Sequence, residues 1–135
     1  MHHRKSHRSL SAIVAGTFLA LAATSAQAAA PAGDAKAGAK LFLQCRACHT
    51  VDVGGKNGVG PNLAGIVGAK AAAVPGYKFS PALTKANITW TPETLDTWLK
   101  RPSAMVPGTK MAFAGMANPK ARADMIAYLS TLKGK

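Results

Sequence analysis

The sequence contains few acidic side chains, few aromatic side chains and only two cysteines. Asp and Glu number five, against 17 Lys and Arg, and aromatic residues make up 6% of the 135 residues. The basic residues form no cluster with interleaved aromatics, which speaks against nucleic-acid binding. Internal repeats and the alternation of apolar and polar residues typical of strands are also missing. Together with a length that leaves room for one domain, these absences predict a small all-α single domain.

Residues 1–28 have the composition of a secretory signal peptide. A basic start precedes an almost wholly apolar run over residues 10–23, and Ala26-Gln27-Ala28 supplies a small-x-small cleavage site. We therefore predict cleavage after Ala28, export to the periplasm and a mature domain of residues 29–135. An uncleaved membrane anchor is the alternative, although the apolar run is shorter than the ~20 residues that a spanning helix needs.

The mature chain would be poor in metal-binding side chains. Three of the 17 basic residues lie in the leader, so 14 remain against five acidic ones, a net charge of +9. The imidazoles are then reduced to that of His49, and the thiols are those of Cys45 and Cys48. A zinc site with the usual four protein ligands cannot be built from these Cys and His residues alone.

Two thiols and one imidazole fall within the pentapeptide Cys45-Arg46-Ala47-Cys48-His49, whose spacing is typical of covalent attachment of a c-type haem. In a helical conformation, positions i, i+3 and i+4 lie on one face and can meet one flat ligand together. Thioether bonds from Cys45 and Cys48 would fasten the haem, and His49 would coordinate the iron. A redox-active or structural disulfide is the competing interpretation. A thioredoxin-like site needs strands alternating with helices, which the sequence does not predict.

Three longer helices are expected in the mature chain. Asp34 can cap the first, over residues 35–46, in which Gly38 suggests a close crossing by another helix. Thr91 followed by Pro92 begins the second, which Pro102 ends after Lys100. Asn118 and Pro119 begin the third, which runs to about Lys133.

Regular structure is sparse between these helices. Residues 50–89 carry seven glycines and three prolines, with short helical turns expected at 62–67 and 80–85. The segment 103–117 is expected to be irregular. A stretch of some 40 residues with so little regular structure is uncommon in a compact domain, and it makes sense if the loop wraps an apolar cofactor.

A haem iron held by His49 has a sixth position to fill, and the mature chain has no second histidine. Methionine sulfur is the expected ligand, from Met105, Met111 or Met116, because Met125 belongs to the apolar stripe of the last helix. Proline and glycine keep Met111 out of a helix, which favours it, but the spacing leaves all three open.

The order of several motifs resembles that of class I cytochrome c, of the mitochondrial and bacterial c2 type, over nearly the whole mature chain. The matching residues are Gly38, Phe42, Cys45-x-x-Cys48-His49, Gly60-Pro61-Asn62-Leu63, Pro75-Gly76-Tyr77, Ile88-Thr89-Trp90, Pro107-Gly108-Thr109-Lys110-Met111, Phe113-Ala114-Gly115 and Ile126-Ala127-Tyr128-Leu129. The resemblance implies a cytochrome c fold around one haem c, with His49 and Met111 as the iron ligands.

The resemblance also implies roles for other residues around the haem. Pro61 would accept a hydrogen bond from the second ring nitrogen of His49. Trp90 would donate to a haem propionate and Thr109 would serve the same side, while Tyr77 belongs to the matching Pro-Gly-aromatic turn. Gly38 and Tyr128 match the close crossing of the first and last helices.

The chain departs from the family at several positions near the haem. Ala69 replaces a frequent arginine, Phe79 a tyrosine and Leu83 an asparagine, and Trp98 stands where the family has a tyrosine near the distal sulfur. Trp98 is therefore also expected beside the cofactor. Fewer polar partners would then serve the propionates, so the family's potential cannot be carried over.

The function that follows is soluble, periplasmic transport of single electrons by a monomer that is not an enzyme and takes no small-molecule substrate. Its partners would be membrane redox complexes with acidic docking faces, such as a quinol-cytochrome c reductase, an oxidase or a reaction centre, because the chain is basic. A peroxidase-like enzyme is the alternative if Met111 binds loosely, and a haem-free thiol-disulfide protein is another.

Overall fold

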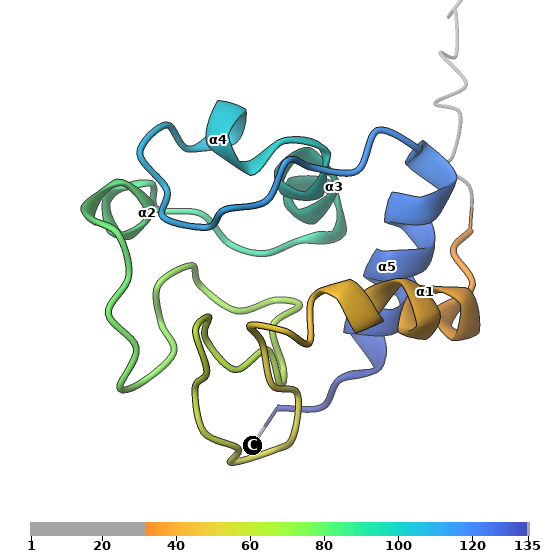
Figure 1. Cartoon of the computed structure of the whole chain (residues 1–135), viewed down its shortest axis with the longest axis horizontal. Coiled ribbons are helices and arrows are strands. Elements are labelled where there is room, and N and C mark those ends of the chain that lie inside the picture. The colour runs from red at the N-terminus through yellow and green to blue at the C-terminus, as the bar shows by residue number, and fades with distance from the viewer. Residues whose placement is uncertain (1–31, 135) are drawn as a thin grey trace, which may run out of the picture.

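Helices α1, Ala35–Leu41, and α5, Pro119–Thr131, cross in close contact, as Figure 1 shows. The computed structural model describes residues 32–134, so the expected signal peptide lies outside the described residues. A Cβ on Gly38 would overlap the backbone carbonyl of Asp124, and Phe42 packs on Tyr128 with ring centroids 5.1 Å apart. The crossing expected from Gly38 and Tyr128 is confirmed.

Helix α3, Pro92–Lys100, begins as its sequence predicts. The Thr91 hydroxyl accepts a hydrogen bond from the Thr94 backbone N–H, and the Thr94 hydroxyl accepts one from the Thr91 N–H. This reciprocal cap satisfies backbone donors that the first helical turn leaves free. Leu95, Trp98 and Leu99 form its buried side.

Two short helices flank this region. Helix α2, Pro81–Lys85, forms where a short helical turn was expected, and the Ser80 hydroxyl caps it. Pro102 ends α3 but also starts α4, Pro102–Met105, in a stretch expected to be irregular. That expectation was wrong at α4, because a proline at the first helical position lacks only an N–H that would have no intrahelical partner.

Two further expectations on helices need correction. The first helix was predicted to continue to Arg46, but it gives way to the 3₁₀ turn η1, Phe42–Gln44, and then to an isolated turn at the cysteines. Residues 62–67 form turns without a helix, whereas α5 ends at Thr131, close to the expected end at about Lys133. Terminal turns are marginal, so neighbouring contacts decide where a helix stops.

The loop from Thr50 to Ser80 is held by side-chain hydrogen bonds and carries one isolated bridge, between Lys70 and Thr89. The Asn62 amide donates to the Thr50 hydroxyl at 2.8 Å and to the Asp52 carbonyl at 3.0 Å. Residues 32–134 contain no strand, in agreement with the all-α prediction. No helix in that range is both long and apolar enough to span a bilayer.

Candidate functional site: an apolar cavity with two thiols, an imidazole and a thioether

A cavity of about 300 Å³ lies at the centre of the molecule, between the Cys45–His49 turn, the long loop and the segment that carries Met111. Its apolar walls include Phe42, Leu95 and Leu99. Nine residues that the sequence assigns to a cofactor site line this one cavity: Cys45, Cys48, His49, Pro61, Tyr77, Trp90, Trp98, Thr109 and Met111. Of the other positions expected near the cofactor, Phe79 and Leu83 also line it, whereas Ala69 does not.

The pentapeptide forms a single helical turn. The backbone N–H of His49 donates to the Cys45 carbonyl at 2.9 Å, and that of Cys48 donates to the same oxygen at 3.1 Å. Positions i, i+3 and i+4 therefore share one side, as the spacing requires. The Cys45 thiol is half-buried and the Cys48 thiol is exposed, and both are free.

The His49 ring is fixed by the segment that faces it. Its Nδ1 lies 2.8 Å from the Pro61 carbonyl oxygen. A carbonyl can only accept, so Nδ1 carries the proton and Nε2 keeps the lone pair that a metal can use. Gly60 packs against the ring, where a Cβ would lie 2.5 Å from Cε1. Backbone contact and hydrogen bond together set the tautomer and orientation of the imidazole.

The cavity distinguishes among the methionines that the sequence left as candidate iron ligands. Met111 lines it, whereas Met105 and Met116 do not. Met125 also lines it, but its side chain is 1% exposed and belongs to the packed face of α5. A turn with Gly108 at φ +87° precedes Met111, and the Thr109 hydroxyl accepts a hydrogen bond from the Met111 N–H at 3.4 Å.

Aromatic and polar contacts join the other segments around the cavity. The Tyr77 hydroxyl donates to the Val59 carbonyl at 2.8 Å, and the Lys110 ammonium lies 4.4 Å from the centroid of the Tyr77 ring. The same ammonium donates to the Lys78 carbonyl. Trp90 and Trp98 are both buried, and their ring centroids are 5.2 Å apart.

The surroundings of Cys45 do not activate its thiol. Burial raises the pKa of the Cys45 thiol, and the neighbouring Cys48 raises it further. Reactive cysteines of thiol-disulfide proteins instead have a lowered pKa, because the thiolate is the nucleophile.

Two residues at or beside the site were not singled out from the sequence. Ser80 is buried and lines the cavity, although its sequence context indicated only the cap of α2. Arg122 is buried between α5 and α3. The apolar stripe of α5 excludes position 122, so only the tertiary structure reveals this residue.

The donor set and its surroundings fit a covalently held haem. Two thiols and an imidazole with a free Nε2 come from one turn, a thioether comes from a distant segment, and apolar side chains line the space between them. The combination of imidazole and thioether is typical of iron in electron-transfer haem proteins.

Comparison with known proteins agrees with this chemistry. The family model Cytochrome c matches residues 35–133. Cytochrome c2 of Rhodomicrobium vannielii is 47% identical over 104 residues, which cover 77% of this chain and 83% of that protein. Cytochrome c2 of Rhodopila globiformis is 49% identical over 105 residues, covering 77% and 98%. The structure of cytochrome cH from Methylobacterium extorquens superposes with a TM-score of 0.70 at 53% identity, covering 73% of this chain and 99% of that one.

Proposed function

Since the chain belongs to the cytochrome c family, close to bacterial cytochromes c2, and is therefore an electron carrier rather than an enzyme, we propose that it shuttles single electrons in the periplasm between membrane redox complexes. The family and the Cys45, Cys48 pair imply one covalently bound haem c. This group, when bound, supplies an iron that gains and loses one electron.

Four residues of the cavity would hold that group directly. Cys45 and Cys48 would bind it through thioether bonds. His49 would offer Nε2 to the iron, because Pro61 occupies its other nitrogen. Met111 would supply its thioether as the other protein ligand, since it lines the same cavity from a distant segment. Ligands from both His49 and Met111 leave no iron position for a substrate, so outer-sphere electron transfer is the chemistry that remains.

The remaining cofactor contacts come from side chains around the cavity. Trp90 would donate to a haem propionate and Thr109 would serve the same side, while Tyr77 lines the cavity and Trp98 packs against Trp90. Apolar walls keep water away from the group. A soft thioether favours ferrous iron, and burial disfavours the extra charge of the ferric form, so both raise the reduction potential.

Positive charge beside the cavity supports docking to acidic partners. Lys110 is exposed, precedes Met111 and lies over the ring of Tyr77. Lys100 and Arg101 are also exposed, at the end of α3. Such charges speed encounter with an acidic face of a reductase, an oxidase or a reaction centre, and salt weakens the effect.

The presence of Met111 in the cavity is the single observation that carries the proposal, and a visible absorption spectrum tests it. The protein is exported from a host that attaches haem, and ferric and ferrous spectra are compared for the parent, Met111→Ala and the control Met105→Ala. We expect the weak ferric sulfur-to-iron band in the parent and in Met105→Ala, because Met105 does not line the cavity. It should disappear in Met111→Ala. A high-spin ferric parent would overturn the proposal in favour of an open iron.

A further inference from the structure

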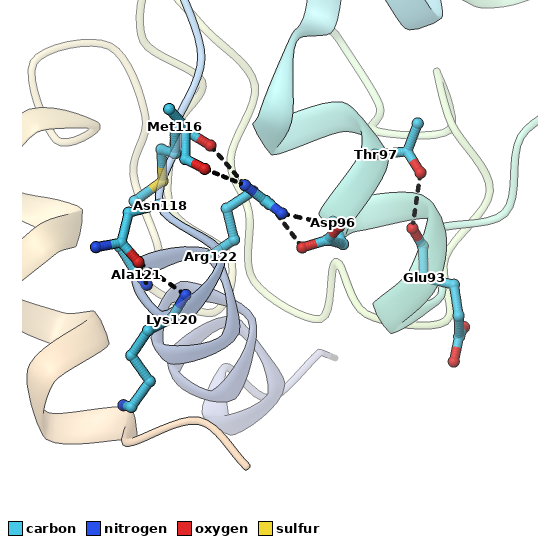
Figure 2. Close-up of polar contacts among 9 residues, drawn as sticks. Glu93, Asp96, Thr97, Met116, Asn118, Lys120, Ala121 and Arg122 are labelled. Carbon is cyan, nitrogen blue, oxygen red and sulfur yellow. Dashed lines mark hydrogen bonds and ion pairs between the residues drawn. The ribbon is translucent and has the colours of Figure 1, made fainter. Parts of the chain in front are cut away.

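Arg122, on α5, is buried in spite of its charge, with 7% of the residue exposed. Its Nη1 donates to the backbone carbonyls of Met116 at 2.8 Å and Ala117 at 2.9 Å. On the other side, Nε donates to Asp96 Oδ1 at 2.7 Å and Nη2 to Oδ2 at 3.4 Å. Figure 2 shows the guanidinium between the backbone of Met116 and the carboxylate of Asp96, on α3.

The two carbonyls mark the end of the segment that carries Met111. Next to them, the Met116 N–H donates to the Leu99 carbonyl at 2.8 Å, at the end of α3. Gly115 has φ +107°, and a Cβ there would overlap the Lys100 carbonyl. The backbone at residues 115 and 116 therefore lies directly against the end of α3.

Among residues 32–134, the guanidinium of Arg122 is the one side-chain group that donates hydrogen bonds to the backbone carbonyls of residues 110–117. A planar fork of five N–H groups can serve two carbonyls and a carboxylate at once, which the point charge of a lysine cannot do. The Asp96 carboxylate balances the buried charge, so the guanidinium can remain between α5 and α3.

We propose that Arg122, held by Asp96, is a positioning residue for Met111: it anchors residues 116–117 and thereby keeps the thioether at the iron. This inference rests on the proposed function, in which Met111 is a ligand. Four residues lie between Met111 and Met116. Release of the anchored end gives this short span the freedom to carry Met111 away from the cavity.

The test uses haem-loaded Arg122→Met, which keeps an unbranched side chain but removes every donor, and Asp96→Asn, which keeps Arg122 but removes its counter-charge. Lys120→Met is the matched control, because Lys120 is a cation on the same helix that pairs with Asp124 instead of the methionine segment. Asp34→Ala is the stability control, since it removes the cap of α1 far from this segment.

Two rates are measured under native conditions. Hydrogen exchange at the Met116 amide reports release of the anchored end, whether or not Met111 binds iron. The saturating rate of imidazole binding to ferric protein reports departure of the methionine. We expect Arg122→Met to raise both rates about tenfold, through loss of hydrogen bonds from a charged donor. Asp96→Asn should raise both rates by a smaller factor. In the controls Lys120→Met and Asp34→Ala, the ratio of each rate to the rate of global unfolding should stay as it is in the parent.

The outcomes separate this inference from the proposed function. If the parent lacks the sulfur-to-iron band, methionine ligation fails, whatever happens at the Met116 amide. If the band is present and Arg122→Met leaves imidazole binding unchanged, the positioning role is wrong. An equal rise in Asp34→Ala would also overturn it, because general destabilisation would then explain the effect. Should Arg122→Met not fold, the two rates in Asp96→Asn decide the matter.

Discussion

At His49, the neighbouring backbone determines both where the imidazole lies and which nitrogen it offers. The Pro61 carbonyl takes Nδ1–H at 2.8 Å, and Gly60 allows the backbone to approach the ring. The motif Gly60-Pro61 in the sequence thus has two separate physical uses, one steric and one a hydrogen bond. Neither depends on a side chain other than that of His49 itself.

The steric use of Gly60 predicts the effect of adding one methyl group. In Gly60→Ala, the new Cβ would lie within 3 Å of three ring atoms of His49. We expect the free energy of unfolding to fall by about 1–3 kcal/mol, as for overpacked cores, and the absorption spectrum to show weakened axial ligation. Denaturant unfolding and ferric spectra measure the two effects.

Gly134→Ala is the matched control for Gly60→Ala. Its nearest neighbour would be the Gly65 Cα at 3.4 Å, an ordinary contact distance. Its stability and spectrum should stay close to those of the parent. Equal effects of the two substitutions would show that contact with the His49 ring is not the cause.

At the scale of elements, the crossing of α1 and α5 is a contact between backbones. Gly38 lies on the carbonyl of Asp124, and Gly33 lies in the same way on that of Ala123. Beside them, Phe42 and Tyr128 pack at 5.1 Å between ring centroids. Two helices can approach this closely only where one of them lacks side chains, so a helix-weakening residue is retained inside α1.

The crossing predicts that Gly38→Ala changes stability with a sign opposite to that expected from helix propensity. In an exposed helix the substitution would stabilise by about 1 kcal/mol. Here the added Cβ meets backbone that cannot move aside, and we expect a net loss of about 3 kcal/mol in the free energy of unfolding. Urea unfolding measures the change. A stabilised variant would show that the helices can separate at little cost.

The same pair of helices predicts a dependence of stability on pH. The Asp124 carboxylate accepts a hydrogen bond from the Asp34 N–H at 2.7 Å and pairs with Lys120, and these contacts, in that order, hold the pKa of Asp124 below its ordinary value. A lowered pKa stabilises the folded state above the ordinary Asp pKa of about 4, and this stabilisation is lost as the pH falls through the lowered value.

Asp124→Asn should therefore be less stable than the parent at pH 7, and the gap should narrow as the pH falls below about 4. Denaturant unfolding over a series of pH values measures it. A gap of constant size would mean that the substitution acts through packing or hydrogen bonding and not through ionisation of Asp124.

Over the whole molecule, the sequence predicted best those features that depend on neighbouring residues, such as the starts of helices. Thr91-Pro92 and Ser80-Pro81 begin helices because cap and proline act within one turn. The end of the first helix was missed, because Gly60 and Pro61, in the following loop, make hydrogen bonds to Cys48 and His49. Arg122 was missed for the same reason: its partners on α3 and at Met116 come together only in the folded chain. Choosing Met111 among the methionines required the family resemblance, and the cavity supplies the physical reason for that choice.

The charge of the whole molecule leads to a prediction that needs no knowledge of the natural partner. Without residues 1–28, 14 basic residues face five acidic ones. Because Lys110 lies over Tyr77 at the cavity, part of this charge stands beside the proposed route of the electron. Oxidation by anionic hexacyanoferrate should therefore slow as ionic strength rises, whereas reaction with a cationic ruthenium hexaammine couple should accelerate.

Lys110→Gln should weaken both salt dependences, because it removes positive charge next to Met111. Lys133→Gln is the matched control: it makes the same change of net charge at an exposed residue that does not line the cavity. Stopped-flow rates over a range of ionic strength distinguish the two variants. Identical slopes would mean that only net charge matters, whereas slopes indifferent to salt in the parent would remove the electrostatic argument for an acidic partner.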